Sequence, residues 1–101
     1  MKKKMSENER KALQAKLSDL EELYAAGYHY AARNQSGELR VYKKKPYKEI
    51  NFWFNYGYGP EYTITIRHDM FDMLNWYDQE PAYIKKEIES IKKQLEDRRD
   101  E

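Results

Sequence analysis

Apolar residues near the start of the chain recur at the spacing of one helical face. The four are Leu13, Leu17, Leu20 and Tyr24. Ser6 stands just before this pattern with Glu9 three residues later, which is the arrangement of a capping box. Gly27 follows the last apolar position and suits the left-handed conformation that often ends a helix. The pattern therefore predicts a helix over about residues 6–26.

Two alternating segments follow, residues 28–33 and 39–43, with Asn34-Gln35-Ser36-Gly37 between them. An asparagine side chain can bond the backbone two residues on, and glycine adopts positive φ without strain. The tetrapeptide therefore predicts a type I turn closed by a glycine bulge, and the two segments form an antiparallel hairpin. Pro46 ends the second strand.

Alternation continues in two later segments. In residues 50–55 it places three side chains on one face: Ile50, Phe52 and Phe54. In residues 62–67 it points another three inward: Tyr62, Ile64 and Ile66. With the hairpin, these segments give four short antiparallel strands, and their short connections predict a meander.

The last third of the chain predicts two helical elements. Residues 68–74 indicate a short helical turn, and Pro81 is expected at the first position of a long C-terminal helix. That helix repeats the apolar spacing of the first one, through Ile84, Ile88, Ile91 and Leu95. The matched stripes predict that the helices pack together, on the sheet, or across a dimer axis, so these four residues are candidates for oligomerisation.

Composition supports a folded domain. Leu, Ile, Val and Phe make up only 17 of the 101 residues, but ten Tyr and two Trp add apolar area and the net charge is +1. The predicted fold is a single α+β domain over residues 1–101: an N-terminal helix, a four-stranded antiparallel meander, a short helical turn and a long C-terminal helix. Residues 1–5 are expected to be a disordered tail.

Several functional classes are disfavoured. The chain has no Cys, which excludes disulfides, thiolate metal sites and a cysteine nucleophile. No apolar run reaches the length of a membrane span, and no hydrophobic stretch follows the basic start, so we expect a cytoplasmic protein. The serines lack a nucleophile elbow and the glycines lack a phosphate-binding context. We therefore expect no enzymatic activity, no cofactor and no membrane partner.

Two stretches, Gly27 to Pro46 and Met70 to Pro81, resemble small uncharacterised proteins of phages and prophages of Gram-positive bacteria. The shared pattern is a Gly-Tyr-x-Tyr-x-Ala-Arg hairpin, a Lys-Pro after it, and a Trp-x-Asp-x-Glu-Pro segment before a terminal helix. The matching residues are Gly27, Tyr28, Tyr30, Ala32, Arg33, Gly37, Lys45, Pro46, Trp76, Asp78, Glu80 and Pro81. The resemblance implies a phage or prophage origin, and a bacterial host cell as the place of action. It assigns no catalytic residue.

An aromatic cluster in the middle of the chain is the first candidate site. Phe52 and Phe54 alternate with Trp53, so both faces of that strand carry rings. If one face is exposed, the anchors for a protein partner are Trp53, Tyr56, Tyr58 and Tyr62, because Trp and Tyr dominate interface hot spots. The alternative is that both faces are covered, in a small domain short of aliphatic residues.

A basic stretch over residues 40–48 is the second candidate. It offers five cations and interleaved tyrosines for a phosphate backbone and stacked bases, through Arg40, Lys43, Lys44, Lys45, Tyr47 and Lys48. The alternative is an edge strand that carries lysines to prevent edge-to-edge pairing, or a solvated charge run.

Acidic residues gather after this stretch, at Glu61, Asp69, Asp72, Asp78 and Glu80. They could imitate the charge of nucleic acid, although a solvated rim with helix caps explains them as well. His68 with Asp69 and Asp72 is too small a set to specify a metal site, so no metal is expected.

Together these features predict a non-enzymatic phage accessory protein that binds a bacterial host or defence protein as an inhibitor or modulator. The second hypothesis is a nucleic-acid-binding accessory protein that uses the 40–48 stretch. The third is a structural homo-oligomer, such as a homodimer, held by the C-terminal stripe.

Overall fold

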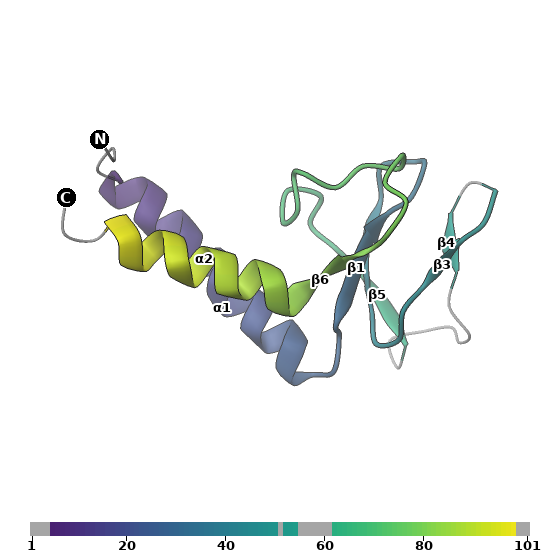
Figure 1. Ribbon diagram of the computed structural model, residues 1–101, viewed down its shortest axis with the longest axis horizontal. Helices are drawn as coiled ribbons and strands as arrows, with labels where there is room; N and C mark the ends of the chain where they lie inside the picture. The colour runs from purple at the N-terminus through teal and green to yellow at the C-terminus, as the bar shows by residue number, and fades with distance from the viewer. Residues whose placement is uncertain (1–4, 51, 55–61, 99–101) are drawn as a thin grey trace.

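The computed structural model describes residues 5–50, 52–54 and 62–98. It shows an α+β fold with a helix near each end and an antiparallel sheet between them (Figure 1). The elements are α1 (Glu7–Ala25), β1 (Tyr30–Arg33), β2 (Leu39–Tyr42), β3 (Tyr47–Lys48), β4 (Trp53–Phe54), β5 (Thr63–Ile66), β6 (Ala82–Tyr83) and α2 (Ile84–Arg98).

Local sequence signals place the first helix and the hairpin as predicted. The Ser6 hydroxyl accepts the Glu9 N–H at 3.1 Å and so caps α1. At its other end Gly27 has φ +101°, and the Tyr28 N–H donates to Leu23 O at 3.0 Å, which completes a Schellman motif. Gly37 has φ +94° in the turn between β1 and β2.

The main sheet has four strands in the order β5-β2-β1-β6. The predicted strand 62–67 is present as β5 and pairs directly with β2. Of the predicted strand 50–55, the described residues Trp53–Phe54 form β4, which pairs with β3 in a separate two-stranded sheet and not with the main sheet. Residues 51 and 55 lie outside the described residues. The fourth strand of the main sheet is β6, which pairs with β1. Its residues were expected to lie at the start of the C-terminal helix.

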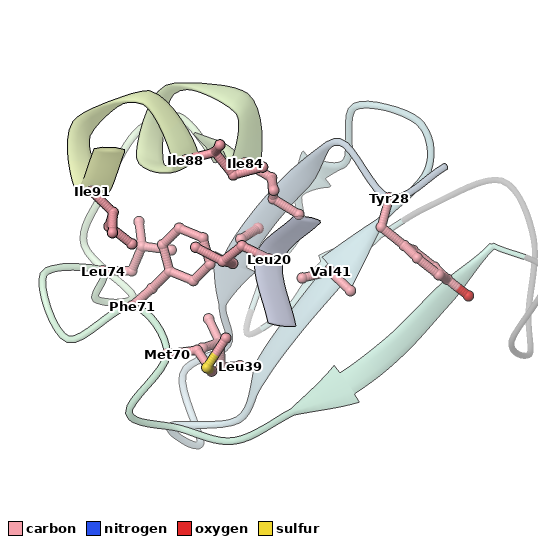
Figure 2. Close-up of a cluster of buried hydrophobic side chains, with 11 residues drawn as sticks. Leu20, Tyr28, Leu39, Val41, Met70, Phe71, Leu74, Ile84, Ile88 and Ile91 are labelled. Carbon is pink, nitrogen blue, oxygen red and sulfur yellow. The ribbon is translucent and has the colours of Figure 1, made fainter. Parts of the chain in front are cut away.

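The main core fills one face of the sheet, where Figure 2 shows its side chains converging between α2, the strands and the segment before α2. It is formed by Leu20, Tyr28, Ala31, Leu39, Val41, Met70, Phe71, Leu74, Ile84, Ile88 and Ile91. Ile64 and Ile66 point toward it as predicted and are half-buried. Tyr62, predicted to point inward with them, stays 37% exposed.

The segment 67–74 forms consecutive turns in place of the predicted short helix. Arg33 of β1 fixes these turns, because its guanidinium donates to the carbonyls of Leu74 at 2.7 Å, His68 at 2.7 Å and Phe71 at 3.0 Å. A fourth bond reaches Gly37 O at 2.8 Å. One side chain therefore joins the β1–β2 turn to three carbonyls of segment 67–74, of which Phe71 O also accepts the Leu74 N–H at 3.0 Å.

The C-terminal helix begins later than predicted. Pro81 is buried and precedes β6, so it does not occupy the first helical position, and α2 begins at Ile84. The apolar stripe of α2 lies in the core of its own chain: Ile84 is 0% exposed, Ile88 6% and Ile91 1%. The stripe predicted to hold an oligomer is therefore covered by other parts of its own chain.

The two helices lie side by side and run in opposite directions, and their far ends extend beyond the sheet (Figure 1). The Lys16 ammonium meets the Glu87 carboxylate at 3.4 Å across this contact, and Arg10 donates to Leu95 O at 3.3 Å. Met5, expected in a disordered tail, is only 6% exposed. The rest of that predicted tail lies outside the described residues.

Candidate protein-binding surface

The two-stranded sheet of β3 and β4, here called the ribbon, has one face toward the main sheet and one away from it. Its register pairs Lys48 with Trp53 and Tyr47 with Phe54. Because side chains alternate along a strand, each pair shares one face. Trp53 is 5% exposed and Tyr47 is 41% exposed, which identifies the Lys48–Trp53 side as the inner face.

The inner face packs on the side of the main sheet opposite the helices. Trp53 joins Ala32 and Tyr42 in a second buried cluster, against which Tyr30 and Trp76 also pack. The alternation of β1 and β2 accounts for this second core, because neighbouring residues of each strand point to opposite faces.

Hydrogen bonds fix the ribbon as well. The Trp53 N–H donates to Asn34 Oδ1 at 2.8 Å, and the Tyr42 hydroxyl donates to Trp53 O at 3.4 Å. Burial raises the pKa of Tyr42 to about 12. The ribbon is thus attached to the hairpin turn at one point and to strand β2 at another.

Lys48 makes a third attachment, to the segment that leads into β6. Its ammonium donates to Trp76 O and, at 3.1 Å, to Asp78 O. It also lies 4.3 Å from the centroid of the Trp76 ring and 5.7 Å from that of Trp53. This lysine, predicted to contact nucleic acid, therefore holds two parts of the fold together through hydrogen bonds and cation–π contacts.

The outer face of the ribbon and the turn between its strands carry apolar side chains, which we call the ribbon face: Tyr47, Ile50 and Phe52, which are exposed, and Phe54, which is half-buried. The rings of Tyr47 and Phe54 have centroids 5.3 Å apart, and those of Phe52 and Phe54 are 6.2 Å apart. Phe52 is 42% exposed and Ile50 is 92% exposed. Such a grouping exceeds the single exposed apolar residues that any protein surface carries.

The aromatic residues predicted to bind a partner differ in their exposure to solvent. Trp53 is buried against the main sheet at 5% exposure, so its side chain is not part of the exposed surface. Tyr62 is 37% exposed. Tyr56 and Tyr58 lie outside the described residues. From the sequence, Ile50, Phe52 and Phe54 were expected on one face of a strand and Tyr47 in the basic stretch, so the ribbon face was not predicted as a binding surface.

The basic stretch does not form one free surface. Arg40 donates to the hydroxyls of Thr63 at 3.2 Å and Thr65 at 2.9 Å on the neighbouring strand. Lys45 pairs with Glu80 at 3.1 Å, and the hydrogen bond to that carboxylate raises the pKa of Lys45. Lys43 is also engaged, because its ammonium lies 5.2 Å from the centroid of the Tyr28 ring. Lys44, in contrast, is exposed.

The acidic residues are also partly engaged within the fold. Asp69 meets Arg67 at 3.5 Å, and Asp78 accepts the Asn75 N–H at 3.0 Å. Asp72 is exposed, and Glu61 lies outside the described residues. This distribution agrees with a rim of ion pairs and turn caps better than with one acidic surface.

Among the described residues, no group of three or more His, Asp or Glu side chains is arranged to hold a metal ion. His68, Asp69 and Asp72 thus do not converge, and the ring of His29 stacks on Tyr24 at 4.6 Å. No helix in this part of the chain has the length and apolar character to cross a membrane. Comparisons with protein-family models, curated proteins and solved structures gave no match.

Proposed function

We propose that this protein is a non-enzymatic binding protein, and that the ribbon face is the surface with which it occupies a partner protein. The observation that carries the proposal is the exposure of Ile50 at 92% and Phe52 at 42% beside two further rings. Burying such side chains against a partner removes apolar area from water, at roughly 25 cal/mol per Å².

The attachment of the ribbon to the rest of the fold supports the same function. Trp53, Lys48 and Asn34 attach the inner face to three separate parts of the fold. Aromatic side chains on a fixed support lose little conformational freedom on binding, which favours affinity. The exposed Lys44 and Glu49 lie next to the ribbon face in sequence and supply the polar rim that is typical of protein interfaces.

The expected class of partner follows from the resemblance of residues 27–46 and 70–81 to phage and prophage proteins. A phage accessory protein acts in a bacterial cell, so we propose a bacterial host or defence protein as the partner, inhibited or modulated by occupation of its surface.

The test compares captured proteins from nuclease-treated bacterial lysate for the tagged wild-type chain and two variants. The variant Phe52→Ser should lose a specific captured protein. Tyr77→Ser is the matched control, because Tyr77 is 83% exposed but lies outside the ribbon. The purified partner should then bind the wild type and the control equally, and bind Phe52→Ser at least about tenfold more weakly.

Equal binding by Phe52→Ser and the wild type would contradict the proposal. Recovery that disappears when nuclease is added would favour nucleic acid instead. Sedimentation of the purified chain checks a third outcome: concentration-dependent dimers that Phe52→Ser disrupts would show that the ribbon face binds a second copy.

A further inference from the structure

The outer strand β5 has an open edge. In the order β5-β2-β1-β6 it pairs with β2 on one side, and within the described residues no strand pairs with its other side. Figure 2 shows β5 as the outer arrow of the sheet next to β2. An edge strand presents backbone N–H and C=O groups that another extended chain can pair with.

The register shows which backbone groups face outward. The Lys43 N–H donates to Tyr62 O at 3.0 Å, so this opposed pair is hydrogen-bonded. Bonded pairs recur at every second residue of an antiparallel ladder, which directs the bonds of Ile64 and Ile66 toward β2. The N–H and C=O groups of Thr63 and Thr65 therefore point toward the open edge.

Natural edges are usually protected by proline, lysine or a charged side chain that points inward. None of these occurs in β5, whose sequence is Thr-Ile-Thr-Ile. The opposite edge of the sheet differs, because β6 has two residues, follows Pro81, and lies near the ion pair of Lys45 with Glu80. Of the two edges, β5 is thus the longer and less protected.

A groove of about 430 Å³ lies beside this edge, between β5 and α1. Its lining residues are Asp19, Glu22, Leu23, Thr65, Ile66, Arg67 and Met70. Leu23, Ile66 and Met70 give it an apolar part. A strand added to β5 would have alternate side chains on the helix side of the sheet, next to this groove.

The charged residues of the groove are mainly acidic. Asp19 and Glu22 stand on α1, and Arg67 is the only cation among the lining residues. Arg67 is also shared, since it lies 3.9 Å from Asp19 and 3.5 Å from Asp69. The acidic side therefore complements a partner segment that carries Lys or Arg.

We propose that the β5 edge accepts an extended segment of a partner protein as an additional strand, and that this segment carries both apolar and basic side chains at the alternate positions that lie on the helix side of the sheet. Its backbone pairs with Thr63 and Thr65. Its apolar side chains contact Ile66 and Met70, and its basic side chains face Asp19 and Glu22. This is strand addition, in which main-chain bonds give affinity and the groove selects side chains. The surface is separate from the ribbon face.

The experiment titrates the labelled full-length chain with acetyl-Lys-Thr-Val-Thr-Lys-Thr-amide, which places Lys and Val on one face of a strand, and follows backbone amide resonances. The matched probe is the same peptide with Glu in place of Lys. We expect the basic peptide to shift resonances of residues 63–66 and of the groove, and the acidic peptide to bind at least about tenfold more weakly at low salt.

Three variants test the details. Glu22→Lys should weaken the basic peptide about tenfold, whereas Glu89→Lys, an exposed charge reversal on α2, should leave it unchanged. Thr65→Pro should abolish binding, because it removes an outward N–H while sparing the backbone hydrogen bonds to β2. Phe52→Ser should bind the basic peptide normally, which separates this proposal from the function of the ribbon face.

Absence of binding by the basic peptide, equal binding of both peptides, or an unchanged affinity in Glu22→Lys would overturn the proposal. Sedimentation provides the remaining outcome. A dimer of the free chain that Thr65→Pro disrupts would show that the edge is occupied by a second copy and not by a basic segment.

Discussion

Tyr42 carries its hydroxyl into the space between the main sheet and the ribbon, where its side chain is only 1% exposed. Burial disfavours the phenolate, so the pKa rises from 10.0 to about 12. Above pH 10 the unfolded chain therefore loses a proton that the folded chain keeps. The free energy of unfolding should fall as pH rises from 10 to 12, by about 2–3 kcal/mol for this group.

Urea unfolding at several pH values measures this effect. Tyr42→Phe should be less stable than the wild type at pH 8, because it loses the hydrogen bond to Trp53 O, but its stability should fall less steeply above pH 10. Parallel pH profiles for the two proteins would show that Tyr42 does not cause the loss.

The ribbon shows which part of the candidate site could be predicted from single residues. Alternation correctly separated Trp53 from Phe52 and Phe54 on opposite faces of one strand. It could not say which face is buried, because both carry aromatic rings. The choice depends on Lys48, which reaches the carbonyls of Trp76 and Asp78 from the Trp53 side. That contact joins positions 28 and 30 residues apart.

At the scale of elements, the helices and the β1–β2 hairpin followed from local signals. Ser6 and Gly27 mark the ends of α1, and Gly37 closes the turn, since each acts on backbone within a few residues. The strand β6 had no such signal. It has two residues and exists because Tyr83 and Ala82 pair with β1, across some fifty residues of sequence. The four-stranded antiparallel sheet agrees roughly with the predicted meander, and it differs in that β6 lies beside β1.

The pairing of α1 with α2 gives a prediction at this scale. Ile88 is 6% exposed within its own chain, so Ile88→Ala should lower the free energy of unfolding by about 2–5 kcal/mol. Lys93→Ala, at an exposed position of the same helix, should change it by less than about 0.5 kcal/mol. Thermal unfolding of the two variants and the wild type provides the comparison.

Protein concentration separates an intrachain from an intermolecular role of this stripe. A contact within one chain gives the same unfolding midpoint over about a hundredfold range of concentration. A wild-type midpoint that rises with concentration, and an Ile88→Ala midpoint that does not, would instead restore the oligomer hypothesis.

The whole molecule is elongated, with extents of 45 × 27 × 18 Å. Its buried side chains gather where the helices meet the sheet, and the far ends of the helices contribute half-buried residues such as Leu13, Leu17 and Leu95. Local opening costs less where fewer apolar contacts are broken. Stability should therefore decrease along both helices with distance from the sheet.

Hydrogen exchange of backbone amides measures this gradient. The slowest amides should lie in β1, β2, residues 17–24 of α1 and residues 84–91 of α2. Amides near Glu7 and beyond Leu95 should exchange much faster. Uniform protection along both helices would contradict the gradient and would indicate that another molecule covers their far ends.

The position of Lys48 has an optical consequence. The chain contains two tryptophans, and both rings lie beside this one ammonium, at the junction between ribbon and sheet. Neither ring belongs to a helix. Tryptophan fluorescence, excited at wavelengths that the ten tyrosines do not absorb, therefore reports on this junction, while circular dichroism at 222 nm is dominated by the helices. The two native tryptophans thus form a fluorescent probe, which needs no added label, directly behind the surface proposed to bind a partner.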